Sequence, residues 1–264
     1  MNKEKLLAGL DAGHVDTKAV IVGEQKILGY ARVPTGFDVA AAAQAALNGA
    51  LENAGVSAAE LAGIATTGIF RDEAKVPLRE GTGTVPEYVA DAKGALFLNK
   101  DSRTVIDIGG NIHKAVLYDR NGGLLDVTQN DKCADGLGVF YTTVSKAMGL
   151  SEQEMSESAL RSGRNLSVAI QCALSAQSDA IDLMCQGAEI ADVANAVLKF
   201  IVERVADMCT YMSLTKEIVV AGGLAKSQAL IGHLARSLKE DLRALDLPEY
   251  VGAIGAAVSC EVGK

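Results

Sequence analysis

A short segment occurs twice in the sequence, and this repeat restricts the fold more than any other feature. Residues 11–20, DAGHVDTKAV, match residues 107–116, DIGGNIHKAV, at Asp, Gly, Lys, Ala and Val with equal spacing. In each copy a turn and a third strand pattern follow. Later in the chain PEYVADAKGA, residues 86–95, resembles PEYVGAIGAA, residues 248–257. Three matches in the same order predict two copies of one βββαβα unit.

Hydrophobic patterns and glycine boundaries place the expected elements. Strands are expected at residues 6–10, 19–22, 27–33, 61–66, 104–106, 115–118, 124–130 and 217–220. Helices are expected at residues 39–53, 139–148, 178–184 and 227–239, with Gly55 ending the first and Ser227 capping the last. We therefore expect a first lobe of residues 1–103 and a second lobe of residues 104–264. The second lobe contains an inserted helical segment, residues 137–215, and a C-terminal helix that packs back on the first lobe.

An acid at the end of a buried strand, followed by glycines, opens each copy of the repeat. Asp11 precedes Gly13, and Asp107 precedes Gly109 and Gly110. Glycines let backbone N–H groups approach phosphate oxygens, and the acid can hold a water or a hydrated Mg²⁺. Two facing copies would place the acids on opposite walls of one cleft, which suits a polyphosphate with a metal ion. The alternative is a pair of ordinary Gly turns, but the paired copies favour a nucleotide.

A third glycine pair, Gly222-Gly223, follows the strand pattern 217–220 and precedes the helix pattern 227–239. Such a junction lets a flat base or ribose lie against bare backbone, so we assign it to the adenosine. Lys18 and Lys114 also recur in the repeat. Each either reaches a phosphate or is a solvated strand residue.

Five cysteines are spread along the chain, and Cys133 is the one that packing explains least well. It lies in NDKCADGLG, a Gly-rich polar loop directly before an expected helix, where unpaired N–H groups stabilise a thiolate. Cys172 lies ahead of or early in another helix, with burial as a small hydrophobe the alternative. Cys185, Cys209 and Cys260 are expected to be small buried hydrophobes. Two thiolates per chain can complete a four-thiolate iron–sulfur site across a two-fold axis.

Composition argues against several classes of protein. The chain has 264 residues, of which 49% are hydrophobic and 4% aromatic, so it can bury a core built of Ala, Val, Ile and Leu. A net charge of −8 without a Lys/Arg cluster argues against nucleic acid as a partner. The N-terminal apolar run breaks at Asp11, and no run is long enough to span a membrane. An odd number of cysteines without disulfide spacing indicates a reducing cytoplasm.

Together these segments resemble the activators of 2-hydroxyacyl-CoA dehydratases and the related ATPase subunits of benzoyl-CoA reductase. The resemblance covers nearly the whole chain, in LAGLDAGHVDTKAVIV, IATTG, VIDIGGNIHKAV, NDKCADGLGVF, CALSAQSDAIDLMCQG, VVAGGLAKSQAL and PEYVGAIGAAV. It implies an α/β fold, the duplicated actin-like (ribonuclease H-like) ATPase fold with two lobes around a nucleotide cleft. It also implies ATP and Mg²⁺ as cofactors, and a dimer that shares one 4Fe–4S cluster held by Cys133 and Cys172 of each subunit.

The same resemblance implies that ATP binding and hydrolysis move the helices that carry the cluster. An electron from ferredoxin or flavodoxin is thereby driven onto a CoA-thioester reductase or dehydratase, and we prefer the benzoyl-CoA reductase type. The neighbouring subunit is a homologous ATPase-fold chain, identical or different. Asp11 and Asp107 are the expected catalytic acids. The expected nucleotide contacts are Gly13, His14, Lys18, Gly109, Gly110, Asn111, Gly222 and Gly223.

Both glycine turns depart from the family pattern. After Gly13 the family usually has Ser or Thr hydroxyls for phosphate, whereas this chain has HVD at residues 14–16 and its first hydroxyl at Thr17. After Gly110 the family commonly has Gln-Asp, which Asn111-Ile112 replaces here. These losses predict slow hydrolysis, and they favour one member of a heteromeric pair over a homodimeric activator.

The three histidines and one acidic run allow more than one interpretation. His14 either donates a hydrogen bond in place of the lost hydroxyl or is a solvent-facing turn residue. His113 alternates with apolar neighbours, which favours a strand-face role, and His233 is expected to be structural. Residues 151–157 are expected to start a solvated helix rather than to bind a metal.

Two other functions fit the same fold. A small-metabolite kinase of the sugar-kinase type would use Asp107 as the catalytic acid near an acceptor hydroxyl, but it gives no reason for Cys133. A nucleotide-binding scaffold subunit that cannot hydrolyse ATP would fit the missing hydroxyls and Ile112.

Overall fold

The structure, a computed structural model, describes residues 5–76, 83–168 and 172–260. The chain divides into two compact units, the first with residues 1–102, 118–125 and 249–264, and the second with residues 103–117 and 126–248. The C-terminal helix and the hairpin tip 118–125 therefore belong to the first unit, although both follow residue 103, where the expected first lobe ends. Among the described residues, no helix is long and apolar enough to cross a membrane.

The first unit is built on a five-stranded sheet with the strand order β3-β2-β1-β4-β5. Its strands are β1 (Leu6–Ala12), β2 (Asp16–Gly23), β3 (Lys26–Pro34), β4 (Leu61–Thr67) and β5 (Gly83–Thr84). β2 pairs antiparallel with β1 and β3, whereas β4 pairs parallel with β1 and β5. The sheet is accompanied by α1 (Val39–Ala54), α2 (Glu87–Leu98) and α8 (Val251–Ser259).

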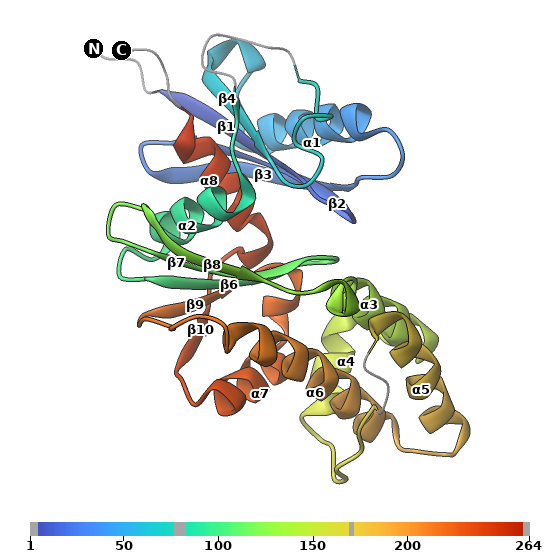
Figure 1. Ribbon diagram of the computed structural model, residues 1–264. Coiled ribbons are helices and arrows are strands. Elements are labelled where there is room, and N and C mark those ends of the chain that lie inside the picture. Colours follow the sequence, from blue (N-terminus) through green and yellow to red (C-terminus); the bar gives the residue numbers. More distant parts are fainter. Residues whose placement is uncertain (1–4, 77–82, 169–171, 261–264) are drawn as a thin grey trace. The chain divides into compact units, whose positions relative to one another are not determined.

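Alternation along β1 places α1 and α8 on opposite faces of this sheet (Figure 1). The even-numbered residues 6–12 are buried in one cluster with apolar side chains of α1. Gly9 points the other way and lies so close to α8 that an added Cβ would overlap the carbonyl oxygen of Ala253. Because side chains alternate along a strand, Asp11 lies on the same face as Gly9. The strand thus presents its terminal acid on the side of α8.

Helices α2 and α8 contain the two similar PEYV segments or directly follow them, and they pack against each other. An added Cβ at Gly94 would overlap the backbone of Val251, and one at Gly255 would overlap the backbone of Ala90. Such close backbone approach is possible only because both helices carry small residues at the contact. The two PEYV segments, the last of the three matches between the copies, therefore lead into two helices that pack against each other.

The second unit repeats the first in strand order and direction. Its strands are β6 (Thr104–Ile108), β7 (His113–Tyr118), β8 (Leu124–Gln129), β9 (Ile218–Ala221) and β10 (Leu242–Ala244), in the order β10-β9-β6-β7-β8. β6 pairs antiparallel with β7 and parallel with β9, as β1 does with β2 and β4. The predicted duplication is confirmed.

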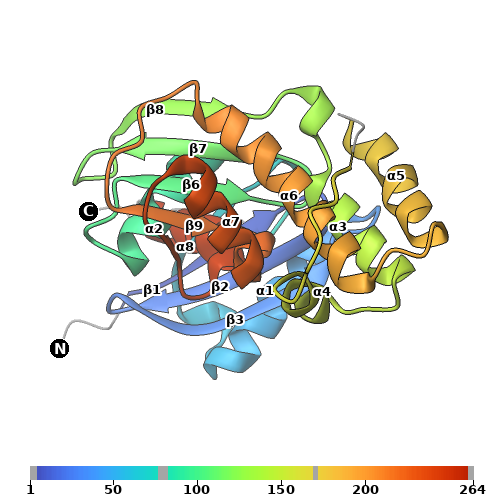
Figure 2. The ribbon, with the colours of Figure 1, turned by 90° about the horizontal axis from the view of Figure 1, so that it is seen from below.

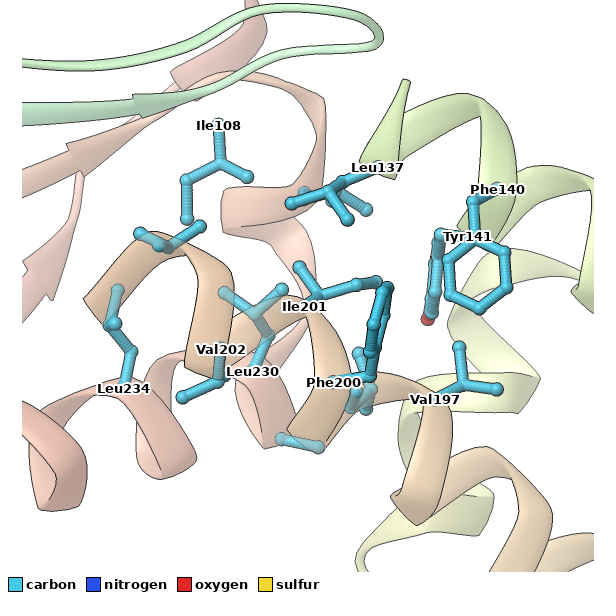
Figure 3. Packing of buried hydrophobic residues seen from close by; sticks show 14 of the residues in the cluster. Ile108, Leu137, Phe140, Tyr141, Val197, Phe200, Ile201, Val202, Leu230 and Leu234 are labelled. Carbon is cyan, nitrogen blue, oxygen red and sulfur yellow. The ribbon is translucent and has the colours of Figure 1, made fainter. Parts of the chain in front are cut away.

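The helices of the second unit are α3 (Leu137–Ala147), α4 (Glu152–Ala159), α5 (Ala173–Cys185), α6 (Ile190–Cys209) and α7 (Gln228–Leu238). Side chains from α3, α6 and α7 meet in one buried cluster with Ile108 of β6 (Figure 3). Within it, the rings of Phe140 and Phe200 meet edge to face at 5.5 Å. Helix α5 packs against α3 and α6, as Figure 2 shows. The start of α3 is thereby fixed to the core of the second unit.

The predicted helix boundaries rest on caps that the structure contains. Gly55 adopts a left-handed conformation with φ 68° and ends α1. Ser227 caps α7 by accepting a hydrogen bond from the N–H of Leu230. Ser151 and Glu154 form a capping box at the start of α4, which confirms a helix start in the acidic run.

Replacing Gly255 by Ala tests the α2–α8 contact. The new methyl group would overlap the Ala90 backbone, so we expect Gly255→Ala to lower the free energy of unfolding by about 3 kcal/mol or more. Gly163→Ala is the matched control, because a Cβ at Gly163 meets no atom within 4 Å. Urea unfolding measures both, and equal midpoints for the two variants would contradict this packing.

Candidate nucleotide and thiol site

Each acid of the repeat forms an ion pair with the lysine of its own copy. The β1–β2 register places Lys18 opposite Asp11, and the lysine Nζ lies 3.0 Å from the carboxylate Oδ2. The β6–β7 register places Lys114 opposite Asp107 in the same way, at 2.9 Å. The Lys114 side chain is only 7% exposed and that of Lys18 17%. Neither lysine is a solvated strand residue, and each holds its acid in place.

A glycine from the parallel neighbouring strand covers each acid. A Cβ at Gly68, which follows β4, would lie 2.6 Å from Oδ1 of Asp11. A Cβ at Gly222, which follows β9, would lie 2.5 Å from Oδ1 of Asp107. Both glycines have positive φ, 93° and 85°, so two constraints require glycine there. The sequence marked Gly68 only as a strand end, although comparing the two copies of the repeat pairs it with Gly222.

The first glycine turn, residues 13–17, offers no hydroxyl to a phosphate. The Thr17 hydroxyl is fully buried and shares a hydrogen bond of 2.9 Å with the Thr35 hydroxyl. Thr35 in turn donates to the carbonyl oxygen of Gly13 at 2.7 Å. His14 is exposed, with its ring 5.3 Å from that of Phe70. Thr17 therefore does not replace the hydroxyl that the sequence lacks, and the side chain of His14 is available at this turn.

The second glycine turn, residues 109–113, packs against the start of α3. A Cβ at Gly138 would lie 2.5 Å from the carbonyl oxygen of Gly109 and 2.7 Å from Cα of Gly110. The N–H of Val139 donates to the carbonyl oxygen of Gly110 at 3.0 Å. Asn111, which is half-buried, accepts a hydrogen bond from the N–H of Gly136 at its backbone oxygen. The turn and the helix start form one hydrogen-bonded structure.

The predicted nucleotide residues fall into two groups, one in each unit. Gly13, His14 and Lys18 lie at the carboxyl end of β1 and the facing end of β2. Gly109, Gly110, Asn111, Gly222 and Gly223 follow β6 and β9, which are parallel neighbours. Gly223 begins a short 3₁₀ helix (Gly223–Lys226), and a Cβ there would meet no atom within 4 Å. Backbone at the carboxyl ends of parallel strands is a common place for ligands in α/β proteins.

His113, the last residue of the second glycine turn, has a buried side chain. Its side chain lies on a strand, as predicted, and it is 1% exposed. Neither ring nitrogen has a hydrogen-bond partner among the described residues. Burial lowers the pKa of His113 from 6.5 to about 4, although the charge of Asp107, the backbone of Ala134 and the charge of Asp135 favour the protonated form. The charge of Lys114 adds to the lowering.

Cys133 and Cys172 both lie at helix starts outside the core. Cys133 is exposed in a short 3₁₀ helix (Lys132–Ala134), and its N–H donates to the carboxylate of Asp131 at 3.0 Å. Cys172 is half-buried at the N-cap of α5, the helix that packs on α3. Cys172 is therefore not fully buried, as it would be if it were only a small hydrophobic residue of the core. In residues 5–76, 83–168 and 172–260, no three His, Cys, Asp or Glu side chains gather as a metal site.

The other cysteines are not all buried hydrophobes. Cys209 is buried in the core, and burial raises the pKa of its thiol to about 12. Cys260 is half-buried, and burial raises the pKa of its thiol too. Cys185 is exposed at the end of α5, so the expectation of burial is wrong there. The helix pattern did not reveal that the last turn of α5 faces solvent.

Comparison with known proteins assigns the chain to a family. Residues 8–259 match the model of the BadF/BadG/BcrA/BcrD ATPase family. The chain belongs to this ATPase family. The match covers both units, and it confirms the resemblance drawn from the glycine turns and the cysteine loop.

The chain is similar over most of its length to dehydratase activators and to a benzoyl-CoA reductase subunit. An activator of lactoyl-CoA dehydratase from Anaerotignum propionicum is 29% identical, over 95% of each chain. A benzoyl-CoA reductase subunit from Thauera aromatica is 29% identical, over 82% of this chain and 77% of that protein. The solved activator of 2-hydroxyisocaproyl-CoA dehydratase from Clostridium difficile, with bound ADPNP, is 25% identical with a TM-score of 0.88, over 97% and 94% of the two chains. The duplicated sheets therefore form the predicted actin-like ATPase fold.

The burial of His113 predicts how stability depends on pH. Its pKa is lower in the folded chain, so the unfolded chain binds more protons between about pH 6.5 and 4, and stability falls as the pH falls through that range. Relative to His113→Leu, which cannot titrate, we expect the wild type to lose about 3 kcal/mol between pH 7 and pH 4. Urea unfolding of both proteins measures this difference, because all other titrating groups are shared. A constant difference across the range would show that His113 is protonated equally in both states.

Proposed function

We propose that this chain is an ATP-dependent electron-transfer subunit that activates a CoA-thioester reductase or dehydratase. One observation carries the proposal, namely that the second glycine turn is packed and hydrogen-bonded to the helix start that follows Cys133. A phosphate-binding turn and a reactive thiol that share one structure suit the coupling of nucleotide chemistry to redox chemistry. The names of the relatives, a dehydratase activator and a reductase subunit, support the same conclusion.

On the nucleotide side, each unit contributes one acid and one glycine turn. Asp11 and Asp107 orient the attacking water or a hydrated Mg²⁺. Lys18 and Lys114 have an acid as partner now, and a bound phosphate provides a second anion within their reach. Backbone N–H groups of the turns at Gly13 and at Gly109–Asn111 bind phosphate oxygens, and His14 adds a donor in place of the missing hydroxyl. Gly222-Gly223 leaves room for the adenosine.

On the thiol side, Cys133 and Cys172 are the ligands that this chain offers to iron. Cys133 is exposed, Cys172 is half-buried, and α3 and α5, the helices that follow them, pack together. Two ligands are half of the set that a 4Fe–4S cluster needs, so a homologous ATPase-fold subunit supplies the other pair. When bound, such a cluster supplies one-electron transfer at low potential, from ferredoxin or flavodoxin to the partner enzyme.

The altered turns favour a heteromeric complex of the benzoyl-CoA reductase type. Thr17 does not restore the lost hydroxyl, and Ile112 stands where the family has an acid. A subunit with weakened hydrolysis is tolerable where a second, different ATPase-fold subunit is present. In a homodimer both nucleotide sites would carry the same defect.

Removing both acids tests the nucleotide half of the proposal. We expect Asp11→Ala with Asp107→Ala to reduce phosphate release by about 100-fold or more, because positioned acids typically contribute that much. Asp126→Ala, which changes an exposed acid on β8, is the control and keeps the wild-type rate. A double variant as fast as the wild type would instead identify a scaffold subunit that cannot hydrolyse ATP.

Removing both thiols tests the redox half. Purified without oxygen, Cys133→Ala with Cys172→Ala should be colourless and free of iron, yet bind nucleotide as the wild type does. Cys185→Ala is the matched control, because Cys185 is exposed on the same helix as Cys172 but at its other end. Iron and visible absorption retained by the double variant would refute this ligand assignment. A wild-type protein that contains no iron and phosphorylates a sugar would instead favour the alternative function, a small-metabolite kinase.

A further inference from the structure

Asn130 is the first residue of the cysteine loop, residues 130–139. Its backbone N–H and its side chain form hydrogen bonds that connect this loop to the second glycine turn. The N–H donates to the carbonyl oxygen of His113 at 3.1 Å, and the side-chain oxygen accepts from the N–H of His113 at 2.6 Å. The side-chain amide donates to the carbonyl oxygen of Asp131 and to the carboxylate of Asp135, both at 2.8 Å. One side chain therefore bonds to the turn on one side and to both flanks of Cys133 on the other.

The two ends of this contact are the groups that the proposed function uses. His113 directly precedes Lys114, whose ammonium group pairs with Asp107. Asp131 accepts hydrogen bonds from the N–H groups of Cys133 and Ala134, so its carboxylate sets the orientation of the cysteine backbone. Asn130 lies between these groups and contacts the neighbours of both.

The first unit contains an informative counterpart. Thr35 follows β3 as Asn130 follows β8, and it also fastens its glycine turn, through the carbonyl oxygens of Val15 and Gly13. The Thr35 hydroxyl bonds to groups of that turn and of β2. Asn130 differs because its amide hydrogens point away from the turn, into the loop that carries the thiol.

We propose that Asn130 is a positioning residue that transmits the nucleotide state of the second glycine turn to Cys133. This inference rests on the proposed function. A phosphate that draws in the N–H groups of the turn displaces the backbone at His113, whose N–H and C=O are both held by Asn130. Asn130 moves with them, and its amide carries the movement to Asp131 and Asp135, which flank the thiol.

Chemical labelling of Cys133 tests this without requiring a loaded cluster. Iron-free protein is alkylated with iodoacetamide, with and without a non-hydrolysable ATP analogue, and the peptide containing Cys133 is quantified by mass spectrometry. In the wild type we expect the analogue to change the labelling rate by about fivefold or more, the size of a modest coupling between sites. In Asn130→Ala we expect equal rates in both states, with nucleotide affinity retained. If Asn130 had only a structural role, the substitution would change the labelling rates of Cys133 with and without the analogue by the same factor.

A second variant covers the case in which Asn130→Ala does not fold. Asp135→Ala removes the exposed acceptor beyond Cys133 and leaves the bonds to His113 intact, so it should weaken the nucleotide effect while keeping affinity. Asn121→Ala, an exposed asparagine at the opposite end of the β7–β8 hairpin, is the control and should match the wild type. A full nucleotide effect in both test variants would overturn the role of Asn130.

Failure of this inference and failure of the proposed function give different results. A wild type that binds iron and releases phosphate, but whose Cys133 reacts at one rate with and without nucleotide, overturns the role of Asn130 alone. A wild type that neither binds iron nor releases phosphate overturns both.

Discussion

The site depends on a contact that occurs once in each unit, between a carboxylate at the end of one strand and a bare glycine at the end of its parallel neighbour. A carboxylate that is largely buried needs a counter-charge, and the lysine on the antiparallel neighbour supplies it. A side chain at Gly68 or Gly222 would displace the carboxylate oxygen, and positive φ disfavours any other residue there. Each acid is thus bounded by backbone, which leaves N–H groups near it that can bind an anion.

Duplication explains why the two units share this geometry, and divergence explains what distinguishes them. Both sheets run three antiparallel strands followed by two parallel ones, so both acids emerge at equivalent positions. After the third strand the copies differ. In the first unit the chain enters α1, which packs on the sheet, whereas in the second it forms the loop of Cys133 and the start of α3. The exposed thiol of Cys133 belongs to the divergent part.

The sequence predicted what local patterns determine, and it failed where partners are distant in sequence. Glycine turns, strand runs and the Ser227 cap are local, and they were found with small shifts in boundary. The bond between Thr17 and Thr35 spans 18 residues and depends on strand register, so the sequence alone did not show that the Thr17 hydroxyl has a partner. The burial of His113 follows from the loop that folds over it, which no periodicity in β7 reveals. The sequence showed Asn130 only as part of a polar loop, because its partners lie on both sides of it.

The start of α3 determines how a change at the second glycine turn can reach the thiol. Leu137 is fully buried in the core cluster, and Gly138 contacts the turn so closely that no side chain fits between them. Close-packed interfaces do not deform continuously but shift between discrete arrangements. A turn that rearranges around a phosphate must therefore either carry the helix start with it or break the hydrogen bond to Val139. Cys133 lies between that helix start and Asn130, both of which are hydrogen-bonded to the turn, so we expect the loop that carries the thiol to follow the same rearrangement.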